Sequence, residues 1–144
     1  MKLRHVGITV SNLSNSLSFY QDILGFTILK EMDESGEQLD NFSGLKDVRV
    51  TTVKLRDSSE GVIELLHYKS HPKSNEANLN QDITFVGCSH FAITVKDLPQ
   101  MYTQLLKNDV SVLCEPQYSP DGNVLLTFCK DPDGTLIELV EELR

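Results

Sequence analysis

The six residues HVGITV, His5 to Val10, return later in the chain as HFAITV, His90 to Val95. The histidine, the isoleucine, the threonine and the last valine all match at one offset of 85 residues (90 − 5 = 85). A second match follows each copy in the same order, because VIEL at residues 62–65 returns as LIEL at residues 136–139. The repeat predicts that the chain is built from two copies of one unit.

Hydrophobic periodicity predicts the same order of elements, β-α-β-β-β, in both halves. In the first half we expect strands at residues 3–10, 26–30, 48–55 and 62–68, with a helix at 13–24. In the second half we expect strands at residues 87–95, 110–114, 124–129 and 136–140, with a helix at 98–108. Residues 31–45 are polar and glycine-containing, which favours a loop or a lid, and residues 69–82 have no apolar period and suggest a linker.

The repeated strand separates an open face from a packing face, because successive side chains of a strand point to opposite sides. The open face holds His5, Gly7 and Thr9 in the first copy and His90, Ala92 and Thr94 in the second. The opposite face is uniformly large and apolar and suits packing under a helix. Small neighbours leave space in front of each histidine, whereas a core face is normally filled.

A lone carboxylate interrupts each of the matching later strands, at Glu64 and at Glu138. Burying such a group is costly unless it is paired, protonated or bound to a cation. Taken singly, a strand histidine is more often a hydrogen-bonded structural residue, and a strand glutamate more often faces solvent. Their joint repetition instead predicts a metal site. Nitrogen and oxygen ligands without a thiolate suit Zn²⁺, Ni²⁺, Co²⁺, Mn²⁺ or Fe²⁺, and the ligands alone do not choose among them.

Charge and composition point to a small-molecule partner. The net charge of −8 leaves no basic stripe for nucleic acid or an anionic membrane. No apolar run approaches the length of a membrane helix, and the N-terminal residues enter a strand pattern rather than a signal peptide. The three cysteines, an odd number without C-x-x-C spacing, predict buried thiols in a reducing cytoplasm rather than disulfides (Cys88, Cys114 and Cys129).

The chain resembles the vicinal oxygen chelate superfamily, which includes glyoxalase I, methylmalonyl-CoA epimerase, extradiol dioxygenases and bleomycin or fosfomycin resistance proteins. The resemblance covers nearly the whole chain and rests on HVGITV with LSFYQDILGF after it, VIELL, SHFAITV and KDPDGTLIELVEEL. It implies an α+β fold of two tandem βαβββ modules, with a curved mixed sheet around a metal-centred cavity. The single domain then spans residues 1–144, with module one at 1–70, the linker at 69–82 and module two at 83–144.

The resemblance also implies a site and a reaction. The implied ligands of one divalent ion (Zn, Ni, Co, Mn or Fe) are His5, Glu64, His90 and Glu138, and the candidate cavity residues are Gly7, Thr9, Tyr68, Ala92 and Thr94. Two His with two Glu is the glyoxalase I pattern, so we expect a metal-dependent lyase or isomerase related to lactoylglutathione lyase. It moves a proton next to a carbonyl through an enediolate. Glu138 is the better candidate base, with Glu64 as ligand or second base.

Several alternatives stay open at this point. An acyl-CoA epimerase typically has Gln where this chain has Glu64, and it has a Gly-rich, double-histidine lead-in that this chain lacks. An Fe-dependent extradiol dioxygenase uses both histidines and the last glutamate, and a non-catalytic protein could keep the metal or ligand site without turnover. Glyoxalase I usually has Arg at Thr9 and Asn at Tyr68, and both help to hold glutathione. The basic residues Arg49, Lys54 and Lys130 are candidate contacts for an anionic thioester or are surface charges. A homodimer is expected, with the site formed within one chain or across two.

Overall fold

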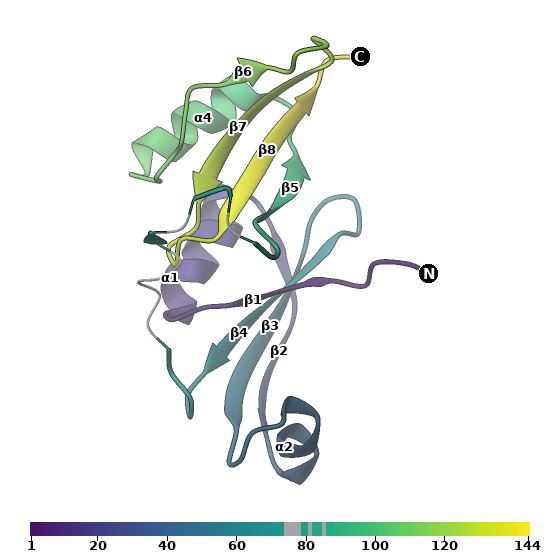
Figure 1. The fold of residues 1–144 in the computed structure, drawn as a ribbon, viewed down its shortest axis with the longest axis vertical. Coiled ribbons are helices and arrows are strands. Elements are labelled where there is room, and N and C mark those ends of the chain that lie inside the picture. Colours follow the sequence, from purple (N-terminus) through teal and green to yellow (C-terminus); the bar gives the residue numbers. More distant parts are fainter. Residues whose placement is uncertain (74–78, 81, 85) are drawn as a thin grey trace. The chain divides into compact units, whose positions relative to one another are not determined.

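The computed structural model describes residues 1–73, 79–80, 82–84 and 86–144. The chain divides into two compact units, Met1–Ser74 and Asn75–Arg144 (Figure 1). Each unit holds one mixed four-stranded sheet with its helices, which confirms the predicted α+β class and the two tandem βαβββ modules. Of the predicted linker, residues 74–78 and 81 lie outside the described residues. None of the described helices combines the length and the apolar composition that a membrane crossing requires.

The first unit runs in the order β1 (Val6–Thr9), α1 (Leu13–Leu17), η1 (Ser18–Ile23), β2 (Thr27–Ser35), α2 (Glu37–Ser43), β3 (Arg49–Arg56) and β4 (Val62–Tyr68). Its sheet has the strand order β1-β4-β3-β2, with β1 parallel to β4 and the other pairs antiparallel. Asn12 caps α1, because its side chain accepts a hydrogen bond from the Asn15 backbone N–H at 3.0 Å. The helix continues as the π-helix η1, where the ring of the fully buried Tyr20 meets Phe19 and Phe26 edge to face.

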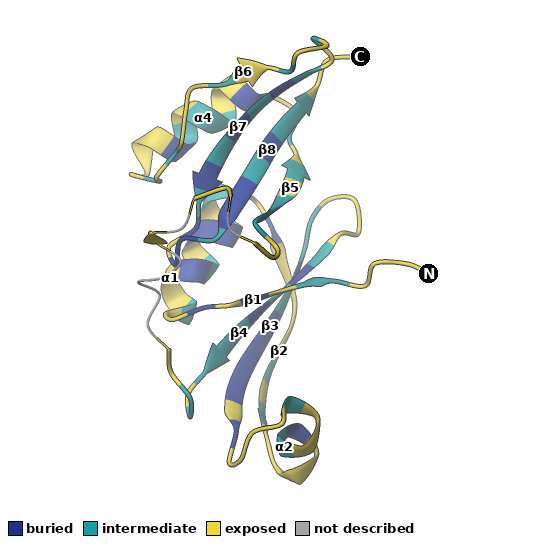
Figure 2. Cartoon of the chain, in the orientation of Figure 1, coloured by how far each residue is buried: buried dark blue, intermediate teal, exposed yellow. Residues whose placement is uncertain are grey.

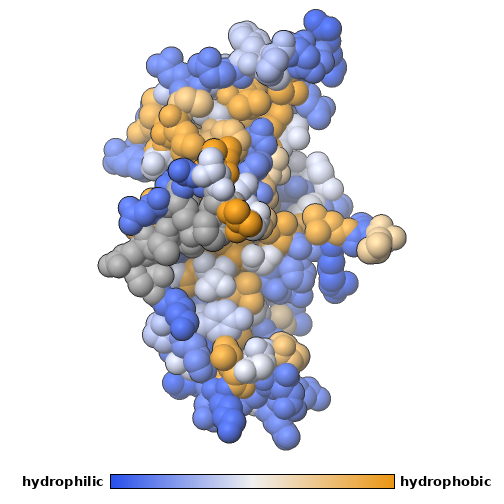
Figure 3. Space-filling view, in the orientation of Figure 1, coloured by the Kyte–Doolittle hydropathy of each residue, from blue (hydrophilic) through white to orange (hydrophobic). Residues whose placement is uncertain are grey.

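The prediction of a loop at residues 31–45 was wrong. The first five of these residues extend β2, and α2 follows and ends at Gly44, whose φ of 70° suits glycine. The anchor of α2 is Leu39, which packs with Val48 and Val50 and with the partly buried Leu66 and Tyr68. A single buried apolar residue in a polar segment gives too weak a hydrophobic period to predict a helix. The face of this end that is turned to the viewer in Figure 3 is mostly hydrophilic.

The second unit runs in the order β5 (His90–Thr94), α4 (Leu98–Lys107), β6 (Gln117–Tyr118), β7 (Val124–Lys130) and β8 (Leu136–Glu142). Its strand order, β5-β8-β7-β6, repeats that of the first unit, again with the first and last strands parallel. Asp97 caps α4 by accepting from the Gln100 backbone N–H at 2.9 Å. The strand predicted at residues 110–114 does not form, because this segment makes one isolated bridge, Val112 to Cys129, and the short β6 takes the edge of the sheet instead.

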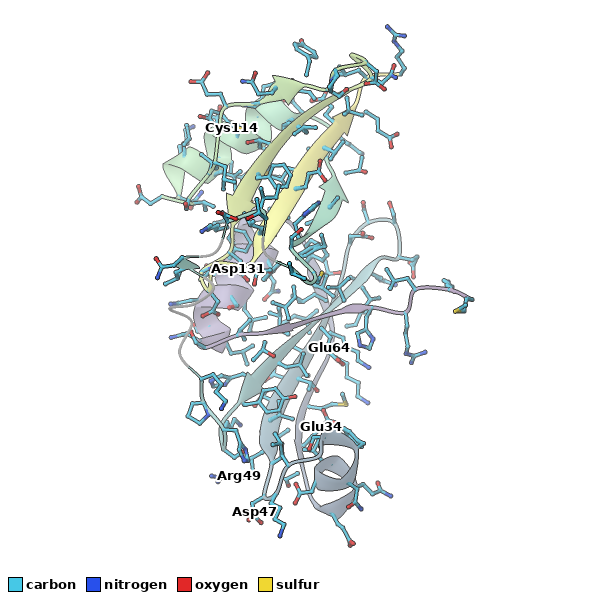
Figure 4. The ribbon with its side chains drawn as sticks, viewed as in Figure 1. Glu34, Asp47, Arg49, Glu64, Cys114 and Asp131 are labelled. Carbon is cyan, nitrogen blue, oxygen red and sulfur yellow. The ribbon has the colours of Figure 1, made fainter. Side chains whose placement is uncertain are left out.

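A buried carboxylate, Asp131, holds the turn that leads into β8 (Figure 4). One of its oxygens accepts from the backbone N–H of Asp133 at 2.9 Å and of Thr135 at 2.8 Å. The backbone N–H of Gly134 donates to the Asp131 carbonyl at 3.0 Å. The sequence Asp-Pro-Asp-Gly therefore forms the predicted tight turn, and this turn fixes where the strand carrying Glu138 begins.

Replacing Asp131 with Ala is expected to lower the free energy of unfolding by about 2 kcal/mol, because two backbone N–H groups lose their acceptor in a buried turn. Denaturant unfolding followed by circular dichroism measures the change. The matched control is Asp121→Ala, which removes an exposed turn carboxylate that accepts from the Asn123 N–H at 3.1 Å. We expect the control to lose less than half as much stability, and an equal loss in both variants contradicts this account of the turn.

The three cysteines differ in exposure, so the prediction that all are buried holds only for Cys129; Cys88 and Cys114 are exposed. Burial, and to a lesser degree Asp131, raises the pKa of the Cys129 thiol to about 12. We expect two thiols per folded chain to react with a disulfide reagent at pH 8, and the third only after unfolding. Because the unfolded chain loses this proton first, stability falls as the pH rises from the ordinary thiol pKa toward 12. Three fast thiols in the folded protein would contradict the burial of Cys129.

Candidate metal centre

The first unit brings together His5 and Glu64, two of the residues predicted from the repeat. Strand β1 pairs in parallel with β4 so that Gly7 lies opposite Glu64. His5 directly precedes β1 and lies two residues before Gly7, on the same face. Its Nε2 is 3.4 Å from Oε2 of Glu64, and the two side chains are 31% and 14% exposed. Figure 4 shows Glu64 on β4 where this strand runs beside β1.

The second unit brings together the other two, His90 and Glu138, in the same way. Strand β5 pairs in parallel with β8 so that Ala92 lies opposite Glu138. The Nε2 of His90 is 3.5 Å from Oε2 of Glu138, and these side chains are also partly exposed. The Ser89 hydroxyl lies 2.8 Å from Nδ1 of His90 and fixes the ring from the other side. The repeated sequence motifs therefore form the same His–Glu arrangement in both units.

Burial along the strands separates the two faces as the alternation predicts (Figure 2). In β1 and the residue after it, Ile8 and Val10 are buried. The predicted cavity residues of the first and fifth strands are exposed, namely Gly7, Thr9, Ala92 and Thr94. Tyr68 shares the face of Glu64 but lies four residues further along β4, where it packs with the cluster around Leu39. The open face beside each histidine is thus lined by small or hydroxyl side chains.

The distances within each pair fit two ligands of one ion better than they fit a hydrogen bond. A nitrogen–oxygen hydrogen bond has its partners at about 2.7–3.2 Å, and both pairs are longer than that. Two neighbouring ligands at about 2.1 Å from one ion are themselves separated by about 3.0–3.4 Å. Among the described residues of each unit, no third His, Cys, Asp or Glu joins either pair to form a metal-holding group. Each unit thus holds one His–Glu pair.

The two glutamates differ in one neighbour across the sheet. Lys54 on β3 pairs directly with Glu64, and its Nζ lies 3.5 Å from Oε1 of that carboxylate. The equivalent partner of Glu138 is Phe128 on β7, whose ring meets the His90 ring edge to face with 5.3 Å between centroids. Sequence reasoning named Lys54 only as a scattered basic residue. The sequence did contain a signal for this equivalence, because Lys54 and Phe128 each precede the glutamate of their own unit by ten residues (64 − 54 = 10, 138 − 128 = 10).

A separate open hollow of about 790 Å³ lies in the first unit at the α2 end of the sheet. Its lining mixes basic side chains, Arg49 and Lys69 among them, with acidic ones such as Glu37 and Asp47. Lys69 is already paired with Asp33 at 2.7 Å. Neither His5 nor Glu64 lines this hollow, so it does not belong to the candidate metal centre.

Comparison with known proteins gives the family. The model of the Glyoxalase/Bleomycin resistance protein/Dioxygenase superfamily matches residues 2–139 of the chain. The chain belongs to this superfamily. Its repeat, its two βαβββ modules and its paired histidines and glutamates are therefore features of a superfamily member, and the resemblance inferred from the sequence is confirmed.

Individual relatives in the superfamily carry glyoxalase names. The chain is 32% identical over 142 residues to a probable lactoylglutathione lyase of Synechocystis sp., covering 98% of this chain and 95% of the relative. A solved glyoxalase family protein from Bacillus cereus has the same fold, with a TM-score of 0.88 at 24% identity over 100% of this chain and 95% of that one. The trypanothione-dependent glyoxalase I of Leishmania major is 27% identical, with a TM-score of 0.69, over 99% of this chain and 87% of that one.

Proposed function

We propose that this superfamily member is a divalent-metal-dependent enzyme of the glyoxalase I type, which converts the hemithioacetal of a 2-oxoaldehyde and a thiol into a 2-hydroxyacyl thioester. The observation that carries the proposal is the same His–Glu pair in both units, with nitrogen–oxygen distances of 3.4 Å and 3.5 Å. The relative named as a lactoylglutathione lyase, similar over nearly its whole length, supports this reaction.

In this proposal the ligands are His5 and Glu64 from a first unit and His90 and Glu138 from a second unit. The two units belong to one chain, or to two chains of a homodimer, which is the expected assembly and which light scattering tests. A divalent ion held by these residues would polarise a carbonyl oxygen of the substrate and so acidify the neighbouring C–H bond. The ligand set of nitrogen and oxygen donors is compatible with Zn, Ni, Co, Mn or Fe.

Glu138 is the proposed base. Its carboxylate takes the proton from the carbon that bears the sulfur and the hydroxyl group, and it returns a proton to the adjacent carbonyl carbon. The hydroxyl proton leaves and the former carbonyl oxygen gains one, so the reaction is a balanced isomerisation. Oε1 of Glu64 faces Lys54, whereas Phe128 occupies the matching place beside Glu138. Glu138 thus has an oxygen without that ammonium beside it, which suits it to the transfer, and Glu64 is the ligand or second base.

The identity of the thiol in the substrate is a separate point of the proposal. The names of two relatives refer to two different thiols, glutathione and trypanothione. Thr9 is exposed and Tyr68 is packed near α2, at the positions where glyoxalase I usually has Arg and Asn. We therefore propose a thiol contact different from that of glyoxalase I, with Gly7, Thr9, Ala92 and Thr94 as walls beside the reacting carbons. The free cysteines favour a reducing cytoplasm as the location.

Thioester formation tests the proposal. The protein is loaded separately with Zn²⁺, Ni²⁺ and Co²⁺ and given hemithioacetals of methylglyoxal with glutathione, trypanothione and a simple thiol. We expect one metal form to produce thioester, seen by ultraviolet absorbance, and the apoprotein to produce none. Solvent deuterium entering an acyl-CoA would favour the epimerase, oxygen uptake with a catechol would favour the Fe-dependent dioxygenase, and metal binding without turnover would favour the binding protein. Each of these outcomes, without thioester, overturns the glyoxalase assignment.

A further inference from the structure

The two halves of the candidate metal centre differ in the residue that lies across the sheet from the glutamate. In the first half this residue is Lys54, and in the second it is Phe128. The Lys54 ammonium lies beside Oε1 of Glu64, and His5 lies beside Oε2 of the same carboxylate. Glu64 is therefore held between an ammonium group and an imidazole, and only Oε2 is directed to the side of His5.

An ammonium group in this place has two opposite electrostatic effects. It repels a divalent cation bound a few ångström away, and it attracts an anionic oxygen that binds next to that cation. The Lys54 side chain is 29% exposed, so it is only partly screened by solvent beside the 14% exposed Glu64. The distance of 3.5 Å to Glu64 is longer than a hydrogen bond. The ammonium group and the carboxylate thus form an ion pair without a close hydrogen bond.

We propose that Lys54 is a specificity-determining residue, which makes the metal centre favour ligands that bind the ion through an oxygen carrying a negative charge. The proposal rests on the proposed function, because it needs the metal centre. Lys54 lowers the affinity for the divalent ion and raises the affinity of the loaded centre for such an anion. Phe128 carries no charge at the equivalent place in the second unit. The preference for anionic ligands therefore comes from Lys54 in the first unit.

The test measures both affinities in the full-length protein with Co²⁺ and with oxalate as the anionic two-oxygen probe. In Lys54→Met, which keeps the length of the side chain without its charge, we expect Co²⁺ to bind about ten-fold tighter and oxalate to bind the Co²⁺-loaded protein about ten-fold more weakly. The visible spectrum of Co²⁺ reports both steps. Lys54→Arg keeps the charge and is expected to restore both values to within about three-fold of the wild type.

The matched control is Arg56→Met, which removes a like charge two residues further along the same strand. Arg56 is paired with Glu60 at 3.2 Å, and this pair is exposed. We expect the control to change either affinity by less than about two-fold, as is usual for an exposed pair. If Lys54→Met does not fold, Lys54→Gln takes its place, with the same two changes expected.

Opposite changes in the two affinities support the proposal. Unchanged affinities, a fall of both affinities together, or equal effects in Lys54→Met and Arg56→Met overturn it. A wild type that binds no Co²⁺ overturns it together with the proposed function. A wild type that binds Co²⁺ and oxalate but forms no thioester overturns the glyoxalase assignment alone, and the Lys54 comparison still decides the role of Lys54.

Discussion

Glu138→Gln is expected to lower kcat for thioester formation by about 10²–10⁴-fold, the range that a general base usually contributes. The amide has nearly the same shape as the carboxylate and keeps an oxygen beside His90, but it cannot take a proton. We therefore expect the variant to bind Co²⁺ within about ten-fold of the wild type, so that the loss falls on kcat rather than on metal content. Steady-state kinetics together with metal analysis of the same samples measure both quantities.

The matched variant is Glu64→Gln, which makes the same chemical change in the equivalent pair of the first unit. Because Glu64 is held between Lys54 and His5, we expect it to act mainly as a ligand and its amide to retain most of the activity. Methylmalonyl-CoA epimerases, which belong to the resembled superfamily, typically have Gln at this place. If Glu64→Gln loses as much activity as Glu138→Gln, or more, the assignment of the base to the second unit is wrong.

Removing either histidine is expected to have the second large effect. His5→Ala and His90→Ala each take away one of four proposed ligands, and we expect the affinity for Co²⁺ to fall by at least about 100-fold, since loss of a mere supporting contact already costs about 10–100-fold. Because the two histidines occupy equivalent registers with their glutamates, the two losses are expected to be similar. Competition with a chelator measures the affinities.

The control for these variants is His71→Ala. His71 is partly buried, lines the hollow near α2 and contacts Ser70, so its loss tests the effect of removing any histidine from the first unit. We expect no change in Co²⁺ affinity from this variant. If one of His5→Ala and His90→Ala leaves the affinity unchanged, then that half does not contribute its histidine to the ion.

The parts of the fold and site that the sequence predicted are those set by local alternation. Strand periodicity assigns His5 to the face of Gly7, and a parallel neighbour then brings Glu64 within reach of the histidine. The same reasoning holds for His90 and Glu138, so both pairs follow from a few residues each. The internal repeat added the decisive information, because a second copy makes a chance histidine or glutamate a poor explanation.

The parts that were missed depend on contacts between distant segments. Helix α2 is anchored by Leu39, which packs with Val48 and Val50. The residues of α2 themselves have no hydrophobic period that would predict the helix. The edge strand of the second unit is β6 rather than residues 110–114, because it is β6 that pairs with β7. Local alternation does not predict which segment makes this pairing. The contact between Lys54 and Glu64 follows from the register of the β3–β4 hairpin, which alternation alone does not give.

The stoichiometry of Co²⁺ binding tests the central claim most directly, namely that the two His–Glu pairs hold one ion together. Titration of the metal-free wild type, followed by calorimetry and by the visible spectrum, is predicted to end at one Co²⁺ per chain. The double variant His5→Ala, His90→Ala is predicted to bind none at the same concentrations. Two ions per wild-type chain would mean that each pair binds alone, and no bound ion, or undiminished binding in the double variant, would contradict the proposed metal centre.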